Sequence, residues 1–265
     1  MRGVRCEHPP GHRRTGPAGV AMTARLRGLT VRAGANTVLD SVDLTVPSGA
    51  VTALVGESGC GKSMVASALC GLLPPGVDVS GAVTVHGRRL GPRDGAWSAL
   101  RGRAVGTVPQ SAATSFTPVR TVRSQLDEVI HVLGADRTTE QLCAAAGLPA
   151  AALDLYPHEL SGGMAQRAAV AAAVAGDPTL LLADEPTSAL DPATAAGVLA
   201  LLRGHADAGA AVLVITHDLR AVLDVGCDAL AVMRNGRILY SGSPDGVPAD
   251  HPDAEYIGAF FEEIE

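Results

Sequence analysis

Eight consecutive residues in the first quarter of the chain have the types and spacing of a loop that binds phosphate. Glycines allow main-chain N–H groups to turn toward an anion, and a helix that starts after them adds the positive end of its dipole. The run fits the pattern G-x-x-x-x-G-K-[ST], in which the lysine reaches the β- and γ-phosphates and the hydroxyl ligates Mg²⁺. Its residues are Gly56, Glu57, Ser58, Gly59, Cys60, Gly61, Lys62 and Ser63. They predict a nucleotide bound together with Mg²⁺.

A glycine-rich turn without a ligand is the alternative interpretation of this run. The flanking segments argue against it, because 50–55 is a short apolar run typical of a strand and 62–72 has the pattern of a helix. Strand, loop and helix in this order form the context in which such a loop binds phosphate.

Two carboxylates follow another apolar run. Residues 180–183 are apolar and predict a buried strand, and Asp184 and Glu185 come directly after it. Asp184 is expected in the Mg²⁺ shell, and Glu185 is expected to polarise an attacking water. An acidic pair alone also occurs at helix caps. Combined with the phosphate loop, it predicts hydrolysis of the nucleotide.

The composition sets the lysine apart and limits the classes of function. The chain has 265 residues, of which 47% are hydrophobic and 18% charged, and this excludes a disordered chain. Twenty of its 21 basic residues are arginine, and the single lysine is Lys62. The net charge of −6 offers no footprint for sequence-independent nucleic-acid binding, so no nucleic-acid partner is expected.

The cysteines and the apolar runs indicate the compartment. The five cysteines are odd in number, scattered and without a C-x-x-C pair, which predicts reduced thiols rather than a disulfide framework or a zinc site. The longest apolar stretches, such as 208–215, are well short of the ~18 residues of a membrane span. A role at a membrane would therefore be peripheral.

The elements that must position these residues alternate between strands and helices. The sequence predicts strands at 24–31, 38–46, 50–55, 81–85, 180–183 and 211–215, and a hairpin of 229–232 and 237–240 around Asn235-Gly236. It predicts helices at 62–72, 121–147 with a break at Gly134, 162–175 and 192–209. Short apolar strands between helices favour an α/β core with a buried parallel sheet.

The segment from Tyr156 to Arg167, which reads YPHELSGGMAQR, resembles the signature motif of ABC-transporter ATPases. Ser161, Gly162 and Gly163 would stand at the start of a helix and form a second anion site. The resemblance implies that two such subunits dimerise head to tail, with ATP between the phosphate loop of one and the signature of the other. It implies nucleotide contacts for Gln166 as well.

The other motifs of this family follow in its order. Gln110 matches the Q-loop, which senses Mg²⁺ and the attacking water and contacts the membrane partner. Residues 188–191 match the D-loop, which ends at Asp191, and His217 matches the switch histidine near the γ-phosphate. A lone Gln or His would not indicate the family, but six motifs in its order, from Gly56 to His217, do so together, and the resemblance covers about 24–241.

This resemblance implies the fold class and the domains. The expected fold is α/β, a P-loop NTPase with a RecA-like core and mixed sheet, an antiparallel β subdomain and an α-helical signature subdomain. The ATPase domain is expected over 22–241, with the helical subdomain at about 111–175. Residues 1–21 are expected to be a disordered leader or an extension upstream of a true start at Met22, and 242–265 a short C-terminal tail.

Within the family, 110–122 and the string at 156–160 are similar to importers of oligopeptides, dipeptides and nickel. In two features the chain departs from many relatives and resembles the shorter ATPases that import nickel or metal-loaded chelators. One is the short C-terminal tail. The other is Ala33, which stands where many relatives have an aromatic residue that stacks on adenine, and Arg32 is a candidate substitute through its planar guanidinium.

The implied function is ATP binding and hydrolysis in an ABC importer of peptides, nickel or metal-chelator complexes. The implied partners are a second ATPase subunit, identical or related, two transmembrane permease subunits and an extracytoplasmic substrate-binding protein. The implied location is the cytoplasmic face of the cell membrane. The alternative is a soluble ABC-type ATPase of DNA repair or translation, whose long coiled-coil or zinc-bearing insertions are not found here. A non-hydrolysing subunit is disfavoured by Glu185 and His217, and a P-loop kinase by the signature.

Overall fold

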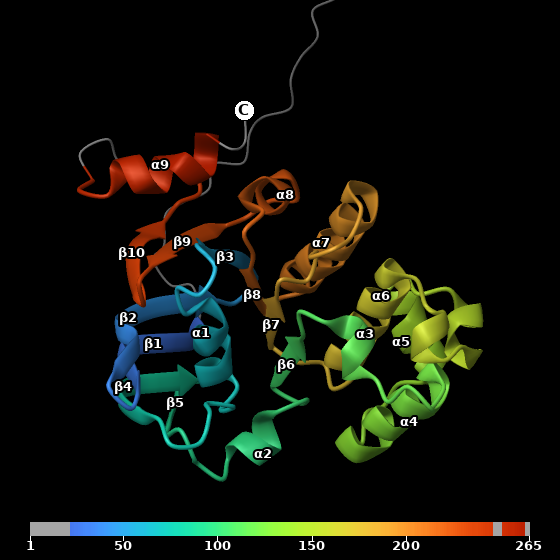
Figure 1. The fold of residues 1–265 in the computed structure, drawn as a ribbon. Coiled ribbons are helices and arrows are strands. Elements are labelled where there is room, and N and C mark those ends of the chain that lie inside the picture. Colours follow the sequence, from blue (N-terminus) through green and yellow to red (C-terminus); the bar gives the residue numbers. More distant parts are fainter. Residues whose placement is uncertain (1–21, 246–250, 263–265) are drawn as a thin grey trace, which may run out of the picture.

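The structure is a computed structural model that describes residues 22–245 and 251–262. Two sheets and a helical lobe form it (Figure 1). The first sheet is antiparallel and four-stranded, in the order β2-β1-β4-β5. Its strands are β1 (Met22–Ala33), β2 (Asn36–Pro47), β4 (Asp78–Val85) and β5 (Arg88–Leu90). The predicted leader, 1–21, lies outside the described residues.

The second sheet has six strands in the order β10-β9-β3-β8-β7-β6. Neighbours from β9 to β6 run parallel, and only β10 is antiparallel to its neighbour β9. The strands are β3 (Ala50–Gly56), β6 (Val105–Val108), β7 (Leu180–Asp184), β8 (Ala211–Ile215), β9 (Ala229–Arg234) and β10 (Arg237–Gly242). The predicted mixed sheet and hairpin are confirmed.

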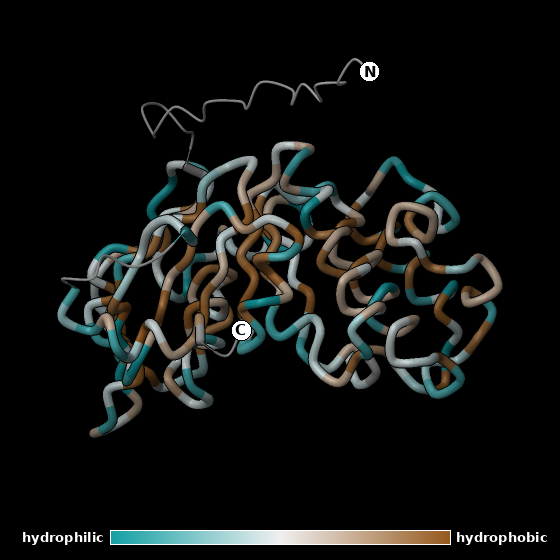
Figure 2. The backbone as a smooth tube through the Cα atoms, turned by 90° about the horizontal axis from the view of Figure 1, so that it is seen from above, coloured by the Kyte–Doolittle hydropathy of each residue, from teal (hydrophilic) through white to brown (hydrophobic). Residues whose placement is uncertain are grey.

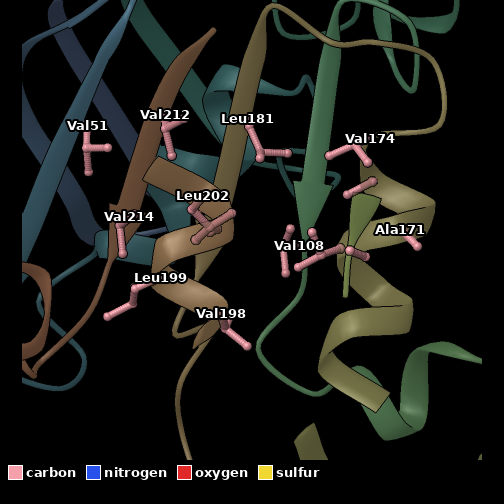
Figure 3. Packing of buried hydrophobic residues seen from close by; sticks show 14 of the residues in the cluster. Val51, Val108, Ala171, Val174, Leu181, Val198, Leu199, Leu202, Val212 and Val214 are labelled. Atoms are coloured by element: carbon pink, nitrogen blue, oxygen red, sulfur yellow. The ribbon is translucent and has the colours of Figure 1, made fainter. Parts of the chain in front are cut away.

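Both faces of the six-stranded sheet are covered, which explains why its strands read as continuous apolar runs. On one face Leu54, Leu182 and Ile215 pack with the antiparallel sheet and with α1 (Lys62–Leu69). On the other face Leu181, Val212 and Val214 face Leu199 and Leu202 of α7 (Pro192–Asp207) (Figure 3). Figure 2 shows these hydrophobic stretches running through the interior of the molecule.

The helical lobe follows β6 and returns to β7. It contains α3 (Ala112–Ser115), α4 (Val122–Leu133), α5 (Thr139–Ala145), the short 3-10 turns η1 (Ala150–Asp154) and η2 (Pro157–Glu159), and α6 (Gly162–Ala173). The predicted break at Gly134 is confirmed, because Gly134 ends α4 with a φ of 59° and Thr138 opens α5 with a capping box. Arg123 of α4 joins Glu140 and Asp154 and so fixes the lobe internally.

Several elements differ from the sequence-based expectation. The first helix ends at Leu69 rather than near residue 72, and α7 ends at Asp207. Short helices α2 (Trp97–Leu100) and α8 (Leu219–Asp224) have too few turns to show a hydrophobic period. The expected tail contains α9 (Ala254–Glu262), which lies over β9 and β10 in Figure 1. Across the described ranges, no helix is long and apolar enough to cross a membrane.

Candidate nucleotide site

The loop between β3 and α1 depends on glycine at two positions. Gly56 has a φ of 155°, and a Cβ atom there would lie 2.2 Å from the main-chain oxygen of Met233. Gly61 has a φ of 109°, and its Cβ atom would lie 2.9 Å from Leu39 Cδ2. Any other residue would collide with β2 or β9 at these points. The packing around the loop, and not only its flexibility, therefore demands glycine.

Lys62 lies at the start of α1, with its side chain folded back over the loop. Its Nζ donates to the main-chain oxygens of Gly56, at 2.6 Å, and Glu57, at 2.9 Å. The residue is 8% exposed. The single lysine thus holds a buried charge against two carbonyls of the loop in which a phosphate would lie.

A cavity of about 570 Å³ opens in front of the loop. Residues from five distant parts of the sequence meet there. Four of these parts follow β3, β8, β7 and β6, which are neighbours in the sheet and have their carboxyl ends at one edge. The predicted site residues that line it are Ser58, Gly59, Gly61, Lys62, Ser63, Gln110, Asp184, Glu185 and His217. Gly56, Glu57 and Cys60 belong to the same loop without lining the cavity.

Glu185 and His217 contact each other in this cavity. His217 Nδ1 lies 2.8 Å from Glu185 Oε2, and the Glu185 side chain is 12% exposed whereas that of His217 is 71% exposed. Glu185 follows β7 in a left-handed conformation, with a φ of 47°, and its N–H donates to the carbonyl of Ile215 at the end of β8. The carboxylate is thus held at the cavity wall by a strained main chain, next to an imidazole that solvent reaches.

Asp184 supplies an oxygen that suits a hard cation. Its Oδ1 is buried and has no hydrogen-bond partner, which is a costly state for a carboxylate. The Ser63 hydroxyl and the Gln110 amide line the same cavity. Mg²⁺ prefers such oxygen ligands and keeps some of its sites for phosphate and water. These residues fit Mg²⁺, and the described part of the chain has no group of three or more His, Cys, Asp or Glu placed for another metal.

The signature residues lie at a different place. Ser161 caps α6 by accepting from the N–H of Met164, and Gly163 approaches α7 so closely that a Cβ atom would lie 2.4 Å from Thr194 Cγ2. Asp191 caps α7, and hydrogen bonds from Thr194 lower the pKa of its carboxyl. None of Ser161, Gly162, Gly163 and Asp191 lines the cavity, so one chain does not bring the two predicted anion sites together.

Gln166 is expected to contact nucleotide from the signature, and within this chain its side chain is largely covered. It is only 5% exposed, and its Nε2 is buried in α6 without a partner. Gln166 is covered because α6 is buried on most of its sides, with Ala165, Ala168, Ala169, Val170, Ala171 and Ala173 buried as well.

The cavity also contains residues that sequence reasoning missed. Val38 of β2 and Met64 of α1 line it. Val38 comes from the antiparallel sheet and has no local pattern that could indicate a site. Arg32 and Ala33, the candidates for the adenine contact, are exposed at the end of β1 and do not line the cavity.

Burial raises the pKa of the Cys60 thiol, against the opposing effect of Lys62. The four described cysteines are free thiols.

Comparisons with known proteins agree with this geometry. The family model described as ABC transporter matches residues 39–188. An oligopeptide transport ATP-binding protein of Mycobacterium tuberculosis is 42% identical over 225 residues, which are 81% of this chain and 37% of that protein. A nickel import ATP-binding protein of Brucella abortus is 41% identical over 81% of this chain and 83% of its own. The chain thus spans about a third of the mycobacterial relative and most of the Brucella one.

The fold is also found among solved structures. A dimeric ATP-binding cassette in a post-hydrolysis state, bound to ADP and Pi, has a TM-score of 0.72 and 25% identity, over 84% of this chain and 100% of its own. The α/β fold is accordingly that of P-loop NTPases of the cassette type, as predicted. With its phosphate loop, its acidic pair and its signature helix, the chain belongs to the family of ABC transporter ATP-binding proteins.

Proposed function

We propose that this protein binds and hydrolyses ATP as a subunit of an ABC importer for peptides, nickel or metal-chelator complexes. The observation that carries the proposal is the single cavity lined by Lys62, Ser63, Asp184, Glu185 and His217. It joins a phosphate loop, oxygen ligands and a carboxylate that can act on water. The relatives named as oligopeptide and nickel transport ATP-binding proteins support the class of cargo.

Each side chain of the cavity has its own role in the proposed reaction. The amides of 58–63 and Lys62 bind the β- and γ-phosphates, which requires Nζ to turn away from its two carbonyls. Ser63, Asp184 and Gln110 would hold Mg²⁺, which supplies charge neutralisation on the phosphate oxygens when bound. Glu185 orients the attacking water and takes its proton. His217 holds the Glu185 carboxylate in place from the solvent side.

A second ATPase subunit, identical or related, completes the site in this proposal. Ser161 and the amides of Gly162 and Gly163 stand at the N-terminus of α6, a place suited to phosphate, but they do not reach the cavity of their own chain. A head-to-tail pair would place them over the phosphate loop of the partner. The solved cassette with ADP and Pi, which is dimeric, supports a pair of ATPase subunits.

Two transmembrane permease subunits are the further partners we propose. A second cavity, of about 620 Å³, lies where the helical lobe meets β6, and its lining includes Pro109, which precedes Gln110 in the sequence. Exposed apolar side chains line it, with Leu72 56% exposed and Val132 67% exposed. This groove would receive helices of the permeases on the cytoplasmic face of the membrane. An extracytoplasmic substrate-binding protein would deliver the cargo.

Replacement of the proposed base tests the reaction. Glu185→Gln keeps the shape of the side chain but cannot take a proton, so ATP turnover should fall by about 100-fold or more while ATP binding stays intact. Glu255→Gln, an exposed position in α9, is the control. Turnover retained in Glu185→Gln would overturn the assignment.

Co-purification tests the transporter. The full chain, expressed in its own cell, should be isolated with two polytopic membrane proteins. If active ATPase is isolated repeatedly without any membrane protein, the soluble alternative in DNA repair or translation replaces the importer.

A further inference from the structure

We propose that Arg101 is a positioning residue for the phosphate loop and acts on it through α1. The proposal rests on the ATP binding proposed above, because it concerns the affinity of that site. Lys62 and Ser63 stand at the N-terminal end of α1, whereas Arg101 contacts the turn at the other end and does not line the nucleotide cavity. A residue that does not reach the nucleotide would thus influence how tightly it binds.

The helix α1 is short, and it depends on its neighbours for its position. It has eight residues, which is little more than two turns. Gly61, its N-cap residue, is in a left-handed conformation and offers no side-chain cap, and phosphate would bind at this end of the helix. Because a helix of this length has few internal hydrogen bonds, contacts with other elements decide where it lies.

The C-terminal end of α1 is closed in part by its own chain. Gly71 follows the helix with a φ of 67°. The N–H of Leu72 donates to the carbonyl of Ser67 at 2.8 Å, and the N–H of Gly71 donates to that of Ala68 at 3.4 Å. These bonds form a Schellman motif, which satisfies carbonyls of the last turn. The carbonyls that come next, those of Cys70 and Gly71, accept from another element.

Arg101 is the donor to these two carbonyls. Its Nη1 lies 3.2 Å from the carbonyl oxygen of Gly71 and 3.5 Å from that of Cys70. The last turn of α1 contains no basic residue, so the guanidinium brings a positive charge to the negative end of the helix dipole that the helix itself lacks. A cation at this end and a phosphate at the other end stabilise the helix in the same orientation.

Arg101 is itself held by a buried ring and by the sheet. The preceding helix α2 places Trp97, which is 2% exposed, against the turn after α1, so that a Cβ atom at Gly71 would lie 2.2 Å from the ring. The Nε1 of Trp97 donates to the carbonyl of Gly91 at 2.8 Å. The main chain of Arg101 pairs with Val105 at the start of β6. The guanidinium is therefore anchored to the sheet that also supplies the nucleotide site.

The surroundings of the Arg101 side chain allow it to be replaced. The residue is half-buried and lines the cavity of about 620 Å³ between the helical lobe and β6, so a shorter side chain would leave no enclosed void. Its loss would remove the donor from the Cys70 and Gly71 carbonyls and the charge from the end of α1. The phosphate loop would then bind phosphate less tightly, although its own residues are unchanged.

Arg101→Gln tests the charge while keeping most of the length of the side chain. Arg101→Lys keeps a charge, but its ammonium ends one bond short of Nη1 and so holds the two carbonyls less well. Arg103→Gln is the matched control, because Arg103 is exposed and donates to the carbonyl of Val132, 3.5 Å away in the helical lobe.

The affinity of the full chain for MgADP is measured by calorimetry for the parent and the three variants. The KM and kcat for MgATP are measured in the same preparations, and thermal unfolding reports on the fold. A residue that only stabilised the fold would change the melting temperature and leave Kd and KM as they are.

We expect Arg101→Gln to raise the Kd for MgADP and the KM for MgATP by about five- to tenfold, with kcat within about twofold of the parent. Arg101→Lys should raise Kd and KM by about two- to threefold, since the charge remains near the helix end. Arg103→Gln should leave both unchanged.

The inference is overturned if the Kd of Arg101→Gln differs less than about threefold from that of Arg103→Gln, or if kcat falls as much as KM rises. If Arg101→Gln does not fold, Arg101→Lys decides, because a Kd equal to that of the parent overturns the inference and the expected rise supports it. If the parent protein binds no MgADP, the proposed function fails instead, and Lys62→Ala shows the signal of a protein without binding.

Discussion

His217 Nδ1 lies 2.8 Å from Glu185 Oε2, although 32 residues separate them in the sequence. The carboxylate is nearly buried and the imidazole is largely exposed, so the histidine covers the carboxylate from the solvent side. The contact exists because β7 and β8 are neighbours and each side chain follows the end of its strand. The order of the strands in the sheet therefore places the proposed base, Glu185, next to His217.

His217→Ala should lower kcat for ATP by about 100-fold, since the Glu185 carboxylate loses the group that orients it. ATP binding should remain, because Lys62 and the loop amides are unchanged. Steady-state turnover and calorimetry measure the two effects. His131→Ala, which changes an exposed histidine in the last turn of α4, should leave kcat unaffected. Equal turnover in both variants would remove His217 from the mechanism.

Lys62→Arg should bind MgATP about tenfold more weakly or worse, a loss of about 1.4 kcal/mol. The ammonium is a compact charge that fits between the carbonyls of Gly56 and Glu57, and a planar guanidinium is too wide for this place. Calorimetry on the full chain measures the affinity, with Lys62→Ala as the reference for complete loss. An arginine variant with the parent's affinity would contradict the proposed role.

Gly56→Ala and Gly59→Ala separate collision from backbone strain. Both glycines have positive φ. A Cβ atom at Gly56 would lie 2.2 Å from the main-chain oxygen of Met233, whereas a Cβ atom at Gly59 would have no neighbouring atom within 4 Å. Gly59→Ala should cost about 1 to 2 kcal/mol of unfolding free energy from the backbone alone. Gly56→Ala should cost about 3 kcal/mol or more, because the collision adds to the strain. Urea unfolding measures both, and equal losses would show that β9 yields to the methyl group.

Asp191→Asn should change how stability depends on pH. Hydrogen bonds from Thr194 lower the pKa of the Asp191 carboxyl in the folded protein. The folded state therefore binds fewer protons than the unfolded state in acid, and the contribution of this charge is present above about pH 4 and is lost as pH falls through the lowered pKa. Asparagine caps a helix about as well but does not titrate.

The parent should accordingly melt at a higher temperature than Asp191→Asn at pH 7, and this difference should shrink toward pH 3. Thermal unfolding at pH 7, 5 and 3 measures it. A difference that stays constant with pH would assign the effect to the cap geometry rather than to the charge of Asp191.

The sequence by itself determined the local features. The run from Gly56 to Ser63, the apolar runs of β7 and β8, and the cap at Ser161 are each set by neighbouring residues, through glycine conformation, burial on both faces of a sheet and helix capping. The order of the motifs was enough for the family and the fold class. The solitary Lys62 already marked the phosphate loop, since this position needs a point charge on a flexible stem.

Only the tertiary structure decided which of these residues lie together. The strand order places Asp184, Glu185 and His217 around the loop, but keeps Ser161 and Asp191 away from the cavity of the same chain. The burial of Gln166, the lining of the cavity by Val38 and the contact of the Tyr256 ring with Arg234 depend on packing between segments far apart in the sequence. Such contacts leave no hydrophobic period and no local motif in the sequence. They form only when the sheets and helices pack against one another.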